Sequence, residues 1–160
     1  MLRYLVPAVV ACLLLGNDPI PNWGETTDAG NLHGTWYGVS NEDSYGDKVD
    51  DLKAVLIFEN NGNFTLKRRG KIILQGTFTT DTSKEPKTID LTITGPDASV
   101  REQYKGKVLG VYQLERDTLK WCHADPVLQP GPRGHLPARP PKITPTNIGE
   151  CCFTFKRLPP

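Results

Sequence analysis

The feature that most constrains the fold is a regular succession of short β-type segments separated by turn residues. Apolar and polar residues alternate within the segments, most clearly where polar residues separate Ile89, Leu91 and Ile93. No stretch has a helical apolar period long enough to stand alone, although residues 40–51 have room for one helical turn. The expected strands are His33–Val39, Leu52–Glu59, Asn63–Arg68, Lys71–Thr79, Thr88–Thr94, Lys107–Leu114, Thr118–His123 and Glu150–Arg157.

Sequential antiparallel strands with one buried face each leave two unpaired sheet edges unless the sheet closes. Closure into an up-and-down barrel removes both edges, and about eight strands enclose packed side chains or one small ligand cavity. We therefore expect residues 32–158 to form an all-β, antiparallel barrel of about eight strands. A two-sheet β-sandwich is the alternative.

The first sixteen residues have the pattern of a secretory signal peptide. Arg3 gives a positive head, and the apolar run from Tyr4 to Leu15 is too short to span a bilayer. Cys12 superficially matches a lipoprotein cleavage box, but the apolar run continues past it, which disfavours lipid anchoring. We expect residues 1–16 to be a signal peptide and residues 17–31 a flexible leader. The mature chain is then exported to the periplasm, cell envelope or extracellular space, with no membrane span.

One long segment, residues 124–147, interrupts the strand rhythm. It holds seven of the 14 prolines, and proline cannot donate to a β-ladder, so this segment is expected to be a loop. Loops of this length are functional lids or excursions from the domain. The basic residues Arg133, Arg139 and Lys142 favour a mobile excursion over an ordered lid.

The cysteines of the last two strands suggest a register. If Cys122 lies opposite Cys152 in an antiparallel pair, Trp121 falls opposite Phe153 and the polar faces also match. We therefore predict a cross-strand Cys122–Cys152 disulfide on the outer face, with Cys151 as a buried thiol.

Two other interpretations of these residues are open. Cys122, His123, Cys151 and Cys152 are soft ligands for zinc, but adjacent strand residues point to opposite faces and cannot all converge without a bulge. A nucleophilic cysteine with a histidine partner is disfavoured for the same reason, since Cys122 and His123 face apart.

Other chemistry is sparse in the sequence. His33, His123 and His135 lie far apart, with no carboxylate spaced beside them in a metal or triad motif. The chain has 19 basic and 18 acidic residues, a balance that gives no electrostatic footprint for nucleic acid. We expect a protein without catalytic residues, metal or cofactor, and without a nucleic-acid partner.

A Gly-Thr-Trp segment opens the first strand. Gly34 permits close backbone approach, so that Trp36 can plug one end of a small barrel. A basic side chain near the end of the last strand, Lys156 or Arg157, is placed to lie over its ring. Gly34, Trp36 and Arg157 are thus the expected structural residues.

Short motifs follow the predicted strands in a fixed order. They are Leu32–Trp36, Phe64–Lys67, Ile73–Phe78, Lys84–Thr92, Gly110–Leu114, Asp117–Cys122, Arg139-Pro140 and Phe155–Arg157. The first resembles the Gly-x-Trp signature of lipocalins. The whole series resembles the lipocalin-like domain of unknown function that is abundant in planctomycete bacteria. The resemblance implies an exported barrel and no established activity, and the expansion of the Pro-rich loop and the Cys151-Cys152 pair depart from it.

The functional expectation is a non-catalytic binding module. A small, partly apolar ligand is expected at one open end of the barrel, near Trp36, Tyr112 and Trp121. The alternative is an interaction or structural role in the cell envelope, with a packed interior and an envelope protein as partner.

Overall fold

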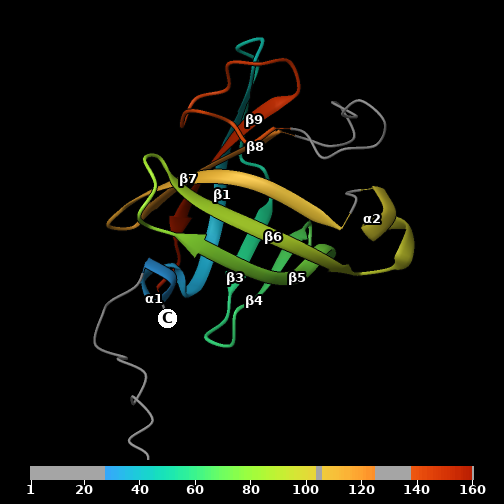
Figure 1. The fold of residues 1–160 in the computed structure, drawn as a ribbon. Coiled ribbons are helices and arrows are strands. Elements are labelled where there is room, and N and C mark those ends of the chain that lie inside the picture. Colours follow the sequence, from blue (N-terminus) through green and yellow to red (C-terminus); the bar gives the residue numbers. More distant parts are fainter. Residues whose placement is uncertain (1–27, 104–105, 125–137, 160) are drawn as a thin grey trace, which may run out of the picture.

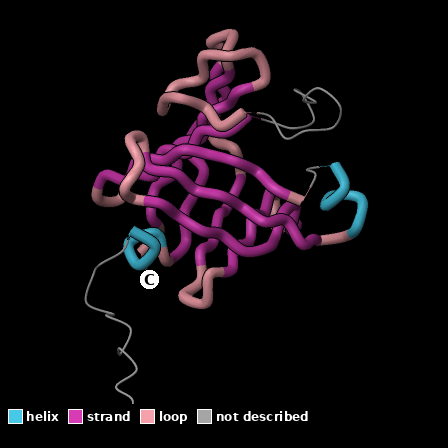
Figure 2. Tube along the Cα trace, viewed as in Figure 1, coloured by secondary structure: helices cyan, strands magenta, loops and turns pink. Residues whose placement is uncertain are grey.

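A computed structural model describes residues 28–103, 106–124 and 138–159 (Figure 1). Within these ranges the chain forms one antiparallel sheet in the order β2-β1-β3-β4-β5-β6-β7-β8-β9, and β1 also pairs with β9. That last pairing closes eight strands into a barrel, whose strands are coloured magenta in Figure 2. Strand β2 pairs with β1 and is additional to the closed ring. The strands are β1 (Gly34–Asp43), β2 (Lys48–Asp50), β3 (Ala54–Phe58), β4 (Asn63–Arg68), β5 (Lys71–Asp81), β6 (Lys87–Gly95), β7 (Lys107–Glu115), β8 (Thr118–Ala124) and β9 (Glu150–Arg157).

The closed barrel confirms the expected all-β fold and excludes the sandwich. The period-2 pattern is the cause: in β3 every second residue, from Ala54 to Phe58, is buried, and in β6 Ile89, Leu91 and Ile93 are each 1% exposed. Each additional buried aliphatic or aromatic side chain contributes about 1.5–3 kcal/mol of transfer free energy. The buried side chains of the barrel strands form one apolar core cluster, which fills much of the interior.

The region between β1 and β3 differs from the expectation. Residues 40–51, which have room for one helical turn, instead continue β1 to Asp43 and form a hairpin with β2. The Asp43 side chain directs the turn, since its Oδ1 accepts hydrogen bonds from the backbone N–H groups of Tyr45 and Asp47 at 2.9 and 3.0 Å. All three residues of β2 are exposed, so no apolar pattern marks this strand in the sequence.

Two short helices complete the described fold. Helix α1 (Asp28–Leu32) takes in residues 28–31 of the expected leader, and the rest of that leader and the predicted signal peptide lie outside the described residues. Helix α2 (Ala98–Gln103) connects β6 to β7. Asp97 caps α2 by accepting a hydrogen bond from the Val100 N–H at 3.0 Å. Both helices are too short for a helical period to be visible.

Helix α1 closes one end of the barrel, beside the start of β1 (Figure 1). Trp36 is fully buried there, and its indole N–H donates to the Leu32 carbonyl at 2.7 Å. Arg157, rather than Lys156, covers the ring of Trp36 and donates to the carbonyls of His33 and Asn31. Gly34 has a φ of +123°, and a Cβ there would lie 3.1 Å from the Arg157 guanidinium. Arg157 of β9 thus holds the segment before β1 in place.

A second contact fixes α1 through Asp28. Its carboxylate accepts hydrogen bonds from Lys87 Nζ at 2.5 Å and from the Tyr112 hydroxyl at 3.0 Å. Burial raises the pKa of Asp28, but the hydrogen bonds from Lys87 and Tyr112 outweigh it, so the net pKa lies below the ordinary value. Burial, with the Asp28 hydrogen bond, raises the pKa of Tyr112. This end of the barrel is therefore sealed by a polar bridge as well as by apolar packing.

The Cys122–Cys152 disulfide is confirmed. The β8–β9 register pairs Cys122 with Cys152, Trp121 with Phe153 and Leu119 with Phe155. Both faces of this strand pair therefore have the partners that the alternation indicates. Cys151 is half-buried rather than buried, because its position on β9 lies at the rim of the barrel.

The described part of the Pro-rich loop, residues 138–147, lies against the outer wall of the barrel. Arg139 donates to Asp90 Oδ1 and to the Gly110 carbonyl, both at 2.6 Å, and Pro140 is buried. These contacts explain why Val111, on the outward side of β7, is only 1% exposed. Residues 138–147 therefore pack on the barrel and do not extend away from it as an excursion, while residues 125–137 of the loop lie outside the described residues.

Candidate functional site

The end of the barrel opposite α1 holds a cavity of about 240 Å³. At this end β3, β5, β7 and β9 begin, and β1, β4, β6 and β8 finish. Most of its lining is aliphatic or aromatic. The lining residues are Asn41, Val49, Leu52, Ala54, Leu66, Arg68, Ile73, Leu74, Val108, Trp121, His123, Cys151, Phe153 and Phe155.

One wall of the cavity is a group of flat rings from β8 and β9. The Trp121 and His123 centroids lie 4.7 Å apart, and the Trp121 and Phe153 centroids 5.9 Å apart. The rings of His123 and Phe153 are nearly parallel, at 10° and 5.6 Å between centroids. Same-face neighbours on paired strands make this geometry, since Trp121 is opposite Phe153 and His123 opposite Cys151. The wall suits a flat, apolar surface on a bound molecule.

Polar groups at this site are few and specific. Cys151 Sγ lies 3.6 Å from His123 Nε2, and 3.8 Å from the His123 carbonyl oxygen. His123 is 6% exposed, so the imidazole is largely shielded from bulk water, whereas Cys151 is half-buried. Such a pair can transfer a proton from sulfur to nitrogen.

The indole N–H of Trp121 is a second polar group. Trp121 is 3% exposed, and within the described part of the chain its Nε1 has no hydrogen-bond partner. The indole lies against Gly110 of β7, where a Cβ would overlap Nε1. A buried donor without an acceptor costs about 1–3 kcal/mol, so an acceptor supplied by a ligand would relieve a real penalty.

The cavity lining carries positive charge only, among the described residues. Arg68 from the end of β4 is its charged lining residue, and the described residues contribute no carboxylate to the lining. Among the described residues, the lining therefore combines one fixed positive charge with the Cys151–His123 pair. It fits a neutral molecule or one with a single negative group.

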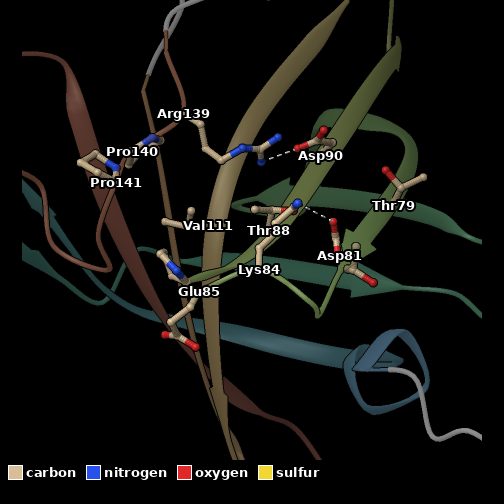
Figure 3. A pocket seen from close by; sticks show the side chains of 12 residues that line it. Thr79, Asp81, Lys84, Glu85, Thr88, Asp90, Val111, Arg139, Pro140 and Pro141 are labelled. Atoms are coloured by element: carbon tan, nitrogen blue, oxygen red, sulfur yellow. Dashed lines mark hydrogen bonds and ion pairs between the residues drawn. The ribbon is translucent and has the colours of Figure 1, made fainter.

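A second depression, of about 640 Å³, lies on the outer wall over β5, β6 and β7 (Figure 3). Figure 3 shows Arg139 reaching from the loop toward Asp90, with Pro140 and Pro141 beside Val111. Asp81 at its edge accepts a hydrogen bond from the Ser83 hydroxyl at 2.6 Å, and that hydrogen bond lowers the pKa of the Asp81 carboxyl group. The charged side chains of Arg139 and Asp90 in this depression therefore already pair with each other. The depression is the place where the Pro-rich loop is attached to the barrel wall.

The structure separates the aromatic residues that the sequence placed at one barrel end. Trp36 and Tyr112 contact α1 at the closed end, whereas Trp121 lines the cavity at the open end. Of the histidines, His123 lines the cavity, His33 lies half-buried near α1, and His135 lies outside the described residues. A four-ligand zinc site is excluded for the cysteine group, because Cys122 and Cys152 are joined to each other.

The pair of His123 and Cys151 is a candidate functional feature that the sequence analysis did not predict. The signal was present: the register that sets Cys122 opposite Cys152 also sets His123 opposite Cys151, on the inner face. Residues adjacent in sequence, such as Cys122 and His123, face apart on a strand, whereas strand pairing brings together His123 and Cys151, 28 positions apart.

The fold and the cavity define a class of protein: a closed eight-stranded antiparallel β-barrel, sealed at one end and hollowed at the other. In comparisons with known proteins, no family model matches the chain, and neither a curated protein nor a solved structure matches it. Among the helices of the described ranges, none has the length and apolar character needed to cross a membrane. The disulfide is consistent with an oxidising compartment.

Proposed function

We propose that this protein is an exported, lipocalin-like binding module without catalytic activity, and that its open-end cavity holds a small, partly apolar ligand. The observation that carries the proposal is the cavity itself, with its apolar lining and the buried Trp121 N–H that faces no acceptor within the described residues. A barrel evolved only as a rigid spacer would gain stability by filling this space.

The lining defines the ligand's chemistry. A volume of about 240 Å³ is below the roughly 300–1,000 Å³ of sites for drug-sized ligands, so the ligand is a small molecule or one end of a longer one. The ring wall of Trp121, His123 and Phe153 favours a flat apolar group. A hydrogen-bond acceptor on the ligand would pair with Trp121, and a negative group would be attracted by Arg68.

Export is the second part of the proposal. The predicted signal peptide at residues 1–16 directs the chain to the envelope or beyond. The Cys122–Cys152 disulfide supports it, because such bonds persist where the compartment is oxidising.

An envelope protein is the alternative partner. Val49 and Ile73, at the rim of the cavity, are 53% and 37% exposed, which favours contact with an apolar surface. In that case the rim, and not the interior, carries the function.

The test is native mass spectrometry of protein purified gently from its own envelope fraction. We expect an adduct of a few hundred daltons that is lost on denaturation. Leu66→Trp should abolish it by filling the cavity, whereas Ile72→Trp, which adds the same side chain at an exposed position outside the lining, should retain it. A bare mass across several preparations, with a cross-linked partner at Val49 or Ile73, would instead establish the envelope interaction.

A further inference from the structure

The thiol of Cys151 has a chemical setting that simple ligand holding does not require. Its Sγ is 3.6 Å from His123 Nε2, on the inner face of the barrel and at the cavity wall. Cys151 is half-buried, so small molecules that enter the cavity can reach it. Reactive cysteines combine partial exposure with a neighbouring base, whereas structural cysteines are sealed in apolar surroundings.

The neighbouring groups restrict what can approach. The rings of Trp121 and Phe153 lie beside the Cys151–His123 pair. The cavity volume of about 240 Å³ admits a small flat molecule but no segment of a partner protein. The Cys122–Cys152 disulfide does not face the cavity. Cys122 and Cys152 are bonded to each other and lie on the opposite face of β8 and β9 from Cys151. Exchange within the barrel therefore does not compete with exchange at Cys151.

We propose that Cys151 is a covalent attachment site for small, flat disulfides that enter the open-end cavity. In the attack, Cys151 Sγ transfers its proton to His123 Nε2 and forms a bond to one sulfur of the incoming disulfide. The sulfur–sulfur bond of that molecule breaks, and the leaving thiolate takes the proton from His123. The products are one mixed disulfide on Cys151 and one free small thiol, so the incoming disulfide is the oxidant.

This inference rests on the proposed function in one respect, that the cavity admits a small molecule. It goes further by naming the reacting atom and the ligand class. The step uses the histidine tautomer whose Nε2 carries no proton. Cys151 Sγ lies 3.6 Å from His123 Nε2 and 3.8 Å from the His123 carbonyl oxygen, so the imidazole nitrogen is the nearer of these two partners.

The experiment uses the whole chain in a Cys12→Ser background, with the Cys122–Cys152 disulfide intact. The protein reacts with 4,4′-dithiodipyridine, a small flat aromatic disulfide, and released thiopyridone is followed by absorbance. We expect one thiopyridyl group per chain, located on Cys151 by peptide mapping. The native rate should exceed that of the same thiol in the urea-unfolded protein by about tenfold.

Two variants test the geometry. His123→Phe keeps a ring in the wall but removes Nε2, and should lower the native rate about tenfold. Leu66→Trp should also slow the reaction by closing the cavity, while Ile72→Trp should leave it unchanged. If His123→Phe fails to fold, the comparison of the two tryptophan variants still decides whether the cavity delivers the reagent.

Three results would overturn the proposal: a native rate below the unfolded rate, a rate unaffected by His123→Phe in folded protein, or label on a residue other than Cys151. Cys151→Ser separates this failure from failure of the proposed function. If that variant keeps its adduct in native mass spectrometry while the wild-type thiol is inert, the cavity binds a ligand without covalent attachment.

Discussion

The guanidinium carbon of Arg157 lies 4.2 Å from the centre of the Trp36 ring, so the last strand covers the plug residue of the first. The same side chain donates to the carbonyls of His33 and Asn31. We expect Arg157→Met to lower the free energy of unfolding by about 2–3 kcal/mol, through loss of charged hydrogen bonds and of the cation–π contact. Urea unfolding measures the change. Lys156→Met, at the neighbouring exposed position, is the control and should change stability by less than about 0.5 kcal/mol. Equal effects of the two variants would contradict the role given to Arg157.

The disulfide between β8 and β9 closes a loop of 30 residues. In the chain-entropy account, Cys122→Ala with Cys152→Ala should lower stability by about 3–4 kcal/mol, because the unfolded chain regains the freedom of that loop. Denaturant titration of the oxidised protein gives the value. Cys151→Ala, which keeps the disulfide, should cost less than about 1 kcal/mol. A larger loss in this control would place the stability in the packing of Cys151.

Asp28 makes stability depend on pH. Its pKa in the folded protein lies below the ordinary value of 3.8, with burial opposing this and the Lys87 and Tyr112 hydrogen bonds producing it. The unfolded chain therefore takes up the proton at a higher pH than the folded one. The stabilisation is complete above the unfolded-state pKa and is lost as the pH falls below about 4, through the folded-state pKa.

Asp28→Asn should remove this part of the acid sensitivity and cost about 1–2 kcal/mol at pH 7, through loss of a charged acceptor. The free energy of unfolding between pH 3 and 7 tests both statements. Asp50→Asn, in an exposed ion pair on β2, is the control and should cost no more than about 0.5 kcal/mol at pH 7. An unchanged acid slope in Asp28→Asn would refute the assignment.

Gly110 makes room for the cavity wall. A Cβ at this position would overlap Trp121 Nε1 and lie 3.0 Å from the Cys122 carbonyl oxygen. We expect Gly110→Ala to destabilise the barrel by about 1–3 kcal/mol through overpacking and to shift the tryptophan fluorescence. Gly30→Ala in α1, where a Cβ meets nothing within 4 Å, should be neutral or should stabilise the protein by up to about 1 kcal/mol. A neutral Gly110→Ala variant would mean that the indole moves freely.

The parts of the fold that sequence predicted are those with a local cause. Alternation in β6 marks Ile89, Leu91 and Ile93 as inward, and the structure buries all three. The Cys122–Cys152 pairing was predictable because only a register that matched both faces of β8 and β9 was acceptable.

The missed parts depend on contacts between distant segments. The β2 strand is exposed throughout, and α1 has five residues, so neither has a periodic pattern to detect. The cavity is set by how far the side chains of Leu66, Leu74 and Phe155 reach from different walls, which residue types alone do not determine. Residue types also do not reveal that Trp36 and Trp121, which we expect from the sequence at one end, lie at opposite ends of the barrel.

The pairing of β1 with β9 also has a consequence for the order of assembly. These two strands pair residues as distant in the sequence as Trp36 and Arg157, whereas β3 to β8 pair mainly with their immediate neighbours along the chain. Contacts of such long sequence separation form late, because the entropy of closing the intervening loop opposes them. We therefore expect the hairpins to form first, while the ring stays an open ribbon until β9 has been synthesised and delivered. Under the export proposed above, a ring that closes only when β9 pairs with β1 would keep the chain pliable during passage across a membrane.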